Sequence, residues 1–186
     1  MEAMRLLHER RSMGKLAGPA PSREQLDALY RAALRAPDHK ELTPWRFIEF
    51  SGEGIDRLGE LFAEGEARKN PDLDASHLDS IRKKPKRAPL IIAVIARGTP
   101  DLPKVPAVEQ VLSAGCAAHA MLLAAQAQGL GAMWRTGTFA FDPVVREGLG
   151  LGEHDEIVAF LYLGQPGGRF PPIPERDPAE FVERWD

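Results

Sequence analysis

Basic, hydroxyl and aromatic side chains recur where the sequence predicts that helices and strands end. Eight such residues stand out, in three groups: Arg10, Arg11 and Ser12; Arg35 and His39; and Trp134, Arg135 and Thr136. Guanidinium groups and a hydroxyl bind phosphate well, and a tryptophan or arginine plane can lie on an aromatic ring. Together these residues could bind an anionic, planar ligand. Each alone also has a simpler explanation, because arginines complement helix C-termini and His39 can face solvent.

Sequence motifs of the common metal, phosphate and nucleophile sites are absent. The chain lacks G-x-x-x-x-G-K-[ST], H-E-x-x-H and G-x-S-x-G, and its five histidines do not have metal-ligand spacing. The glycines of residues 164–168 follow a predicted strand, but they do not form G-x-G-x-x-G before a helix. The single cysteine, Cys116, excludes an intramolecular disulfide, and we interpret it as a small core residue. We therefore expect no metal, no Rossmann site and no nucleophilic side chain.

The composition is that of one ordinary globular domain. The 186 residues fit a single domain spanning 1–186, and 44% of them are hydrophobic. Twenty-four basic and 27 acidic residues leave a net charge of −3, so nothing global indicates binding to nucleic acid. Residues 1–11 are charged and helix-like, unlike a signal peptide. We expect a cytoplasmic protein.

Residues 110–134 carry no charge, in a chain that is 27% charged overall. We predict a helix over 106–128, followed by a short strand that ends at Trp134. A helix without a charged face should be buried on all sides. Its many small residues suit close approach of a second helix, so we expect it at a dimer interface. The alternative is a membrane span, but polar interruptions such as Ser113 and Gln126 and the weakly apolar alanines argue against one.

The remaining elements predict an α+β fold in which helices cover a small sheet. Apolar runs predict strands over 45–50, 90–96 and 156–163, and apolar periodicity predicts helices over 22–35, 55–68, 78–83 and 142–149. We interpret the basic run Lys83, Lys84, Lys86 and Arg87 as solvated surface. Residues 164–178 are rich in proline and glycine and predict no regular element. The apolar residues near the C-terminus indicate that the tail docks on something, for example a neighbouring subunit.

Ordered motifs along residues 3–166 resemble those of the flavin-dependent nitroreductase family, and fit its short bacterial members best. The motifs are LLHERRS (6–12), RAPDHK (35–40) followed by Pro44 and Trp45, SAGCA (113–117), QGLG (128–131), WRTG (134–137) and IVAFLYLG (157–164). No one of these motifs is diagnostic, whereas their order along the chain is specific. Larger members carry a helical insertion over the flavin, for which this chain has little room.

The resemblance implies a nitroreductase-like fold with a small antiparallel or mixed sheet, assembled as an intertwined homodimer on which the tail at 167–186 docks. It implies FMN at the subunit interface. Arg10, Arg11 and Ser12 would hold its phosphate and ribityl chain, and Trp134, Arg135 and Thr136 would line the same site. Arg35 and His39 would reach that site from the partner subunit. NAD(P)H binding would fall on Ala124, Ala125, Gln126, Ala127, Gln128 and Gly129.

The activity implied is ping-pong transfer of two electrons from NAD(P)H, through N5 of the flavin, to a nitroaromatic, quinone or similar small acceptor. The cofactor carries that chemistry, and cations of the protein would stabilise the anionic reduced flavin. Two alternatives remain open at the level of sequence. The chain could reduce an enone or a short semialdehyde on the same fold, or it could be a flavin-binding dimer without turnover.

Overall fold

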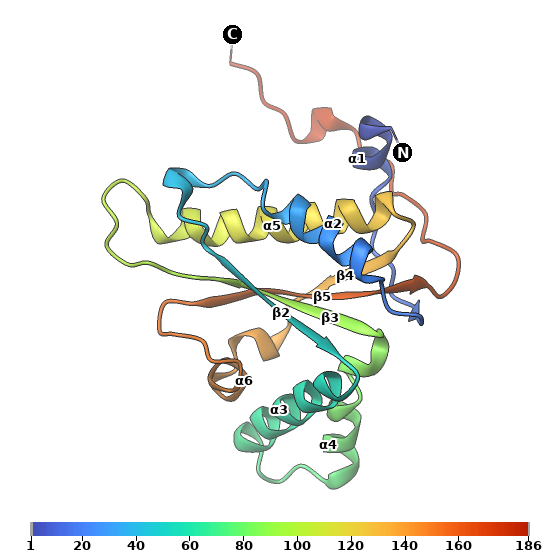
Figure 1. Ribbon diagram of the computed structural model, residues 1–186, viewed down its shortest axis with the longest axis vertical. Coiled ribbons are helices and arrows are strands. Elements are labelled where there is room, and N and C mark those ends of the chain that lie inside the picture. The colour runs from blue at the N-terminus through green and yellow to red at the C-terminus, as the bar shows by residue number, and fades with distance from the viewer. Residues whose placement is uncertain (1, 186) are drawn as a thin grey trace.

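A five-stranded antiparallel sheet forms the centre of the protein (Figure 1). The computed structural model describes residues 2–185. The strands are β1 (Leu16–Ala17), β2 (Trp45–Ser51), β3 (Leu90–Ala96), β4 (Gly131–Arg135) and β5 (Glu156–Pro166). β5 pairs with β3 along one edge and with β4 and then β1 along the other, and β2 lies beyond β3. The predicted α+β fold is confirmed, with β1 unforeseen and β5 extended to Pro166.

Helices cover both faces of the sheet, which explains why its central strands are apolar throughout (Figure 1). The helices are α1 (Ala3–Glu9), α2 (Arg23–Ala33), α3 (Glu53–Lys69), α4 (Ala75–Arg82), α5 (Ala107–Ala127) and α6 (Pro143–Gly148). Successive side chains of a strand face opposite sides. Ile92 and Val94 of β3 therefore pack with α2 and α5, whereas Ile91 and Ala93 pack with α3 and α6. All seven residues of β3 are buried.

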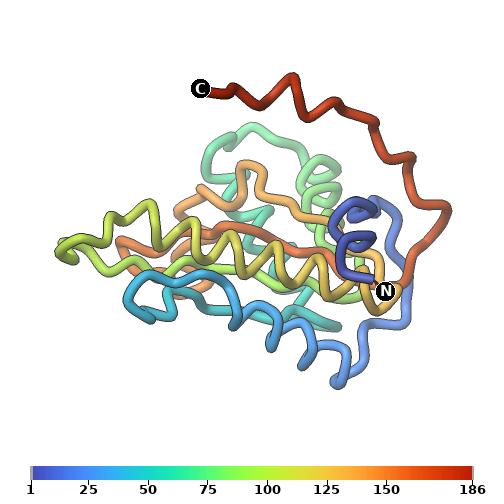
Figure 2. Tube along the Cα trace, turned by 90° about the horizontal axis from the view of Figure 1, so that it is seen from above, coloured from blue at the N-terminus to red at the C-terminus, as the bar shows by residue number. Residues whose placement is uncertain are grey.

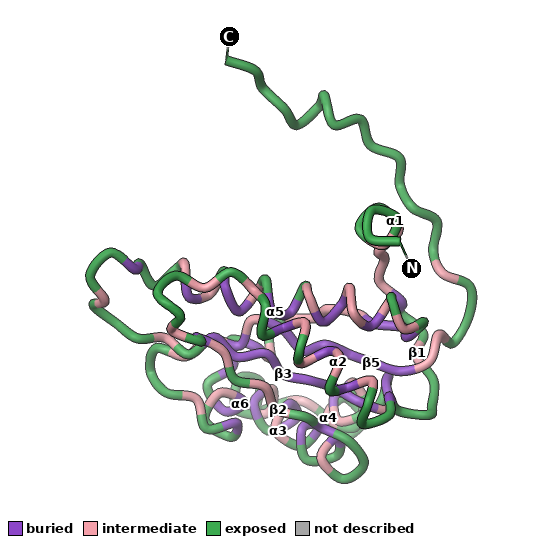
Figure 3. Tube along the Cα trace, turned by 45° about the horizontal axis from the view of Figure 1, so that its top comes forward, coloured by how far each residue is buried: buried purple, intermediate pink, exposed green. Residues whose placement is uncertain are grey.

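α5 has one buried face and one exposed face within the chain (Figure 3). Its alanines at 114, 117, 118 and 125 are fully buried against the sheet and α2. Val108 and Leu112, in contrast, are 60% and 61% exposed. A single chain therefore covers only one face of α5, and burial of the other face at a dimer interface stays a prediction. Cys116 is exposed on this outer face, so its interpretation as a core residue is wrong within the chain. An uncharged helix has no polar side that would show which face is outermost.

Length and composition alone would allow α5 to cross a membrane, and it is the one such helix in residues 2–185. The core helix of a soluble protein passes the same test. Because α5 packs along its length on a sheet that carries further helices on its other face, we interpret it as a core helix.

Both chain ends present apolar side chains that residues 2–185 leave uncovered. The tail beyond β5 runs clear of the sheet and its helices, past α1 (Figure 2). It exposes Phe181, Val182 and Trp185, the last of which is 95% exposed. Met4 and Leu7 of α1 are exposed too. Docking of this tail on a second subunit stays a prediction.

Candidate functional site

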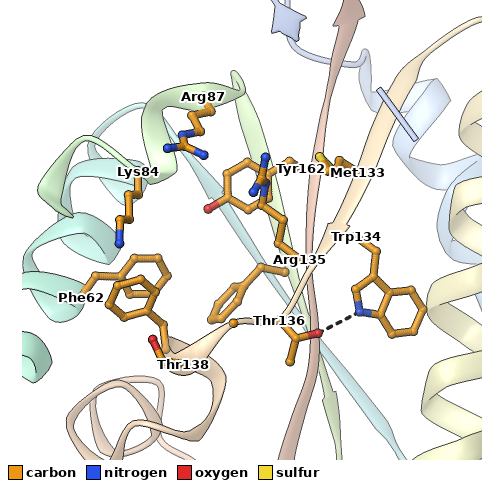
Figure 4. A pocket seen from close by; sticks show the side chains of 12 residues that line it. Phe62, Lys84, Arg87, Met133, Trp134, Arg135, Thr136, Thr138 and Tyr162 are labelled. Carbon is orange, nitrogen blue, oxygen red and sulfur yellow. Dashed lines mark hydrogen bonds between the residues drawn. The ribbon is translucent and has the colours of Figure 1, made fainter. Parts of the chain in front are cut away.

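A cavity of about 440 Å³ lies beside the C-terminal end of β4, on the face of the sheet that α3 covers (Figure 4). Its size is typical of small-molecule sites. The elements around it are α3, the 3₁₀ turn Pro85–Arg87, β4, β5 and the 3₁₀ turn Thr138–Phe141. Its lining residues are Phe62, Lys84, Arg87, Met133, Trp134, Arg135, Thr136, Gly137, Thr138, Phe139, Phe160 and Tyr162. The structure thus places one predicted group, Trp134, Arg135 and Thr136, at a cavity.

Strand alternation divides the three residues of that group between two sides of the sheet (Figure 4). The Arg135 guanidinium points into the cavity, with Cζ 5.6 Å from the ring centroid of Tyr162. The Trp134 side chain points the other way, toward α5, and its Nε1 donates to Thr136 Oγ1 at 3.0 Å. That hydroxyl donates in turn to the carbonyl of Val158 at 3.3 Å. Trp134 and Thr136 therefore brace the end of β4, and Arg135 is the member that presents a charge to the cavity.

Two further cations, Lys84 and Arg87, line the same cavity. Arg87 is exposed, as the sequence indicates, whereas Lys84 is half-buried, and the turn before β3 aims both toward the cavity, across from Arg135 (Figure 4). Their neighbours Arg82 and Lys86 instead form ion pairs at the surface, with Glu60 and Asp56 respectively among their partners. The sequence did hold one signal for this: the basic run directly precedes a fully buried strand, so some of its side chains had to lie near the core.

Flat aromatic side chains form one wall of the cavity, and no sequence pattern predicts it. Phe62 of α3 and Phe139 stack with ring centroids 4.2 Å apart and planes inclined by 6°. Lys84 Nζ lies 4.7 Å from the centroid of Phe139. A cation over an aromatic face is stabilised by about 0.5–2 kcal/mol. A flat apolar wall with cations at its edge suits a planar ligand that carries negative charge.

Tyr162 supplies a hydroxyl to the cavity (Figure 4). Burial raises the pKa of this phenol, and the charges of Arg135 and Arg87 oppose that shift only in part. Tyr162 is therefore a neutral O–H donor near pH 7.

Arg10, Arg11 and Ser12 lie beside the opposite end of β4, at the C-terminal end of α5. The backbone N–H of Arg11 donates to Gln126 Oε1 at 3.0 Å, and that of Met13 donates to the carbonyl of Ala132 at 2.8 Å. The Arg11 guanidinium lies 5.3 Å from the ring centroid of Phe170, and its Nη1 donates to the Pro171 carbonyl. Its Nε is buried, with no hydrogen-bond partner in residues 2–185. Such an orphaned donor is available to an anion.

Arg35 and His39 lie far from that group within one chain. His39 Nδ1 donates to Glu109 Oε2 at 2.7 Å, near the start of α5. The rise of an α-helix puts Glu109 about 25 Å from Gln126, the residue that holds Arg11. α2 runs antiparallel to α5, since Gln128 Nε2 donates to the carbonyl of Gln25 near the start of α2, so Arg35 also lies toward the start of α5. The structure does not bring these two predicted groups together in a single chain.

The segment predicted for NAD(P)H, residues 124–129, is divided between core and surface. Ala125 is fully buried, and Gln128 is engaged with α2 and with the Ala124 carbonyl. Gln126 is the member that touches another predicted site group, through Arg11. Ala127 and Gly129 are exposed.

Comparison with known proteins gives one consistent family. The sequence model of the nitroreductase family matches residues 7–165. The chain is 49% identical over 166 residues to the Escherichia coli K12 protein named "Putative NAD(P)H nitroreductase YdjA", a match that covers 89% of each chain. Its fold is similar to that of a Bacillus cereus nitroreductase-like protein, with a TM-score of 0.82, 24% identity and coverage of 98% and 95%.

A Bacteroides fragilis nitroreductase with bound FMN has the same fold, with a TM-score of 0.73, 21% identity and coverage of 98% of both chains. The family model spans most of the chain, including α5 and all the residues that line the cavity. The chain belongs to the nitroreductase family.

Proposed function

We propose that this protein is an FMN-dependent oxidoreductase that passes two electrons from NAD(P)H to a small planar acceptor such as a nitroaromatic or a quinone. We further propose that it acts as a homodimer, with each flavin site shared between subunits. Family membership supports the reaction class, and the names of its relatives support the donor and the cofactor. The arrangement of site groups along α5 supports the dimer.

The observation that carries the proposal is the separation of two half-sites by an uncharged, exposed helix face. Arg11 lies at one end of α5 and His39 at the other, about 25 Å apart along the axis. Between them the outer face carries Leu112 and Cys116 and no charge from residue 110 onward. In a twofold dimer the same patch meets itself. Antiparallel contact of two such faces sets the start of one α5 beside the end of the other, and so brings His39 of each chain toward Arg11 of its partner.

The residues present fit FMN. Arg10, Arg11 and Ser12 supply positive charge and a hydroxyl for the phosphate, and the orphaned Nε of Arg11 is a donor without another use. The Arg135 side of the cavity, along the edge of β4, fits the flat ring system. When bound, FMN supplies hydride acceptance at N5 and return of the electrons to a second substrate.

The side chains around the cavity bind and stabilise charge. Arg135 is positioned to stabilise negative charge that develops on a ligand beside β4, and a preorganised cation is effective there because it needs no rearrangement. Trp134 and Thr136 hold the end of β4 in place through their shared hydrogen bonds. No side chain has to act as a nucleophile. For a nitro acceptor, NAD(P)H and one further proton convert the nitro group to a nitroso group: one N–O bond breaks and its oxygen leaves as water.

The direct test is optical. The purified protein should be yellow, and its flavin absorbance near 450 nm should bleach on addition of NADPH or NADH without oxygen and return on addition of 1,4-benzoquinone. A protein that cannot be loaded with FMN would refute the cofactor assignment. A loaded protein that neither pyridine nucleotide bleaches would instead be a flavin-binding dimer without turnover.

A further inference from the structure

The cavity beside β4 holds three cations and no acidic side chain. Lys84, Arg87 and Arg135 are among its lining residues, and none of the lining residues is an aspartate or glutamate. Within residues 2–185, none of the three cations forms an ion pair with a carboxylate. Neighbouring basic residues that point away from the cavity, Arg82 and Lys86, are paired. Lys84, Arg87 and Arg135 therefore bring three positive charges to one cavity with no carboxylate beside them.

Like charges that share a site repel one another, and an anion between them relieves that repulsion. The proposed function accounts for one negative charge, on reduced flavin, which Arg135 can stabilise. Lys84 and Arg87 reach the cavity from the turn before β3, across from Arg135 (Figure 4). Two cations on that side remain without a negative partner.

The side chains around Lys84 and Arg87 indicate which kind of anion fits beside them. Lys84 Nζ lies over the ring of Phe139, and that ring is stacked on Phe62. The Tyr162 hydroxyl faces the same space (Figure 4) and is a neutral donor. A flat apolar wall, two cations and one hydroxyl fit a carboxylate attached to a planar ring or conjugated chain.

We propose that the acceptor reduced in this cavity is a planar, conjugated carboxylate, held through its carboxylate by Lys84 and Arg87. The inference rests on the proposed function and names the substrate class of the same site. The class includes nitro-substituted aromatic acids, whose reduction has the balance given above and leaves the carboxylate untouched.

Anionic oxygens near Lys84 and Arg87 could also come from the 2′-phosphate of NADPH. The stacked aromatic wall favours a carboxylate that is part of a flat conjugated molecule, because such a molecule contacts the wall while its charge meets the cations. The two possibilities predict different preferences. A site for the acceptor's carboxylate prefers an acidic acceptor over its neutral analogue, whereas a site for the 2′-phosphate prefers NADPH over NADH.

The test compares 4-nitrobenzoate with 4-nitrobenzamide, which have nearly the same shape but differ by one charge. The flavin-loaded protein and the variants Lys84→Met and Arg87→Met are assayed for kcat/KM with both acceptors. Lys86→Met is the matched control, since Lys86 belongs to the same basic run but pairs with Asp56. A charged hydrogen bond is worth roughly tenfold or more in binding. We expect a preference for 4-nitrobenzoate of about tenfold that each cavity variant loses through KM, while the control keeps it.

Equal kcat/KM for the two acceptors in the unaltered protein would overturn the proposal. If the cavity variants lose only a preference for NADPH over NADH and keep the preference for 4-nitrobenzoate, the two cations bind the 2′-phosphate and the proposal is wrong. Equilibrium dialysis of benzoate against benzamide on the same proteins, with folding checked by circular dichroism, measures the preference without turnover. If NAD(P)H does not bleach the bound flavin, the proposed function is wrong. If benzoate and benzamide bind equally, only this inference is wrong.

Discussion

The two ends of α5 differ in how completely one chain builds its surroundings. At the C-terminal end, Gln126 holds the backbone of Arg11, and Gln128 holds the start of α2. β4 follows at once and leads to the cavity. At the N-terminal end, His39 and Glu109 form an exposed pair at a shallow surface. At the C-terminal end the chain holds its own basic residues in place, whereas the N-terminal end carries polar groups that have no deep site of their own. A second copy of the chain would supply each end with what it lacks.

The two faces of α5 also differ, since one packs on the sheet and the other is exposed. A glutamate introduced on each face in turn should therefore have different effects. Ala117→Glu places a carboxylate against the sheet, where Ala117 is fully buried. An unpaired buried charge costs several kcal/mol, which is a large part of the stability of a typical domain. We expect the protein to be largely unfolded by circular dichroism. A folded Ala117→Glu protein would mean that this face of α5 is not in the core.

Leu112→Glu changes the outer face and should leave the chain folded, because Leu112 is 61% exposed. If this face is the interface, each dimer would bury two unpaired glutamates in it, and the dimer should dissociate and lose its flavin together. Sedimentation velocity and flavin content measure the two effects, and Leu112→Gln is the matched neutral control. A flavin-loaded dimer with glutamate at position 112 would remove the outer face of α5 from the interface.

Arg11→Ala tests the phosphate site proposed at the C-terminal end of α5. It removes a charged partner of the proposed phosphate, which is worth about 1.5–3 kcal/mol, or roughly ten- to hundredfold in FMN affinity. The effect should shrink at high salt, since ions screen it. Arg5→Ala is the control, because Arg5 lies on α1 and pairs with Glu9 at the surface. Fluorescence titration with FMN gives the affinities. Equal FMN affinity in Arg11→Ala and the unaltered protein would remove the phosphate from this position.

The smallest expected effect concerns alkaline stability. Burial raises the pKa values of both tyrosines of the chain, Tyr30 and Tyr162. In the unfolded chain a tyrosine ionises near pH 10, whereas the folded protein keeps these two neutral to higher pH. Their contribution to the free energy of unfolding is therefore complete below about pH 10 and is lost as the pH rises further. Tyr162→Phe should reduce this alkaline loss in urea unfolding curves. An unchanged pH dependence would show that Tyr162 is not desolvated.

Local sequence pattern predicted the elements that depend on local physics. The continuous apolar run of β3, the periodicity and capping box of α2 and the uncharged run of α5 each determine their own element. β1 was missed because two residues carry no pattern and their pairing with Gln165 and Pro166 is tertiary. The outer position of Cys116 was missed because small, uncharged residues on all sides of the helix hide its orientation.

The candidate site was predicted in part for the same reason. Arg135 stood at a strand end, and alternation along β4 then decided that it, and not Trp134, faces the cavity. The basic run predicts surface positions for Lys84 and Arg87, and only the packing of their turn against α3 shows that both line the cavity. Phe62 and Phe139 come from distant elements, and their stacking has no signature in the sequence.

Subunit exchange tests the shared site most directly. One protein carries Arg10→Ala and Ser12→Ala, and the other carries Arg35→Ala and His39→Ala, so that every flavin site in each pure dimer is damaged. After free exchange half the dimers are mixed, and each mixed dimer has one intact site and one doubly damaged site. Since loss of two such partners should abolish binding, flavin content and NAD(P)H oxidation should recover to about one quarter of the unaltered protein. If mass spectrometry confirms exchange and neither recovers, each flavin is held within a single chain, and the account of α5 is wrong.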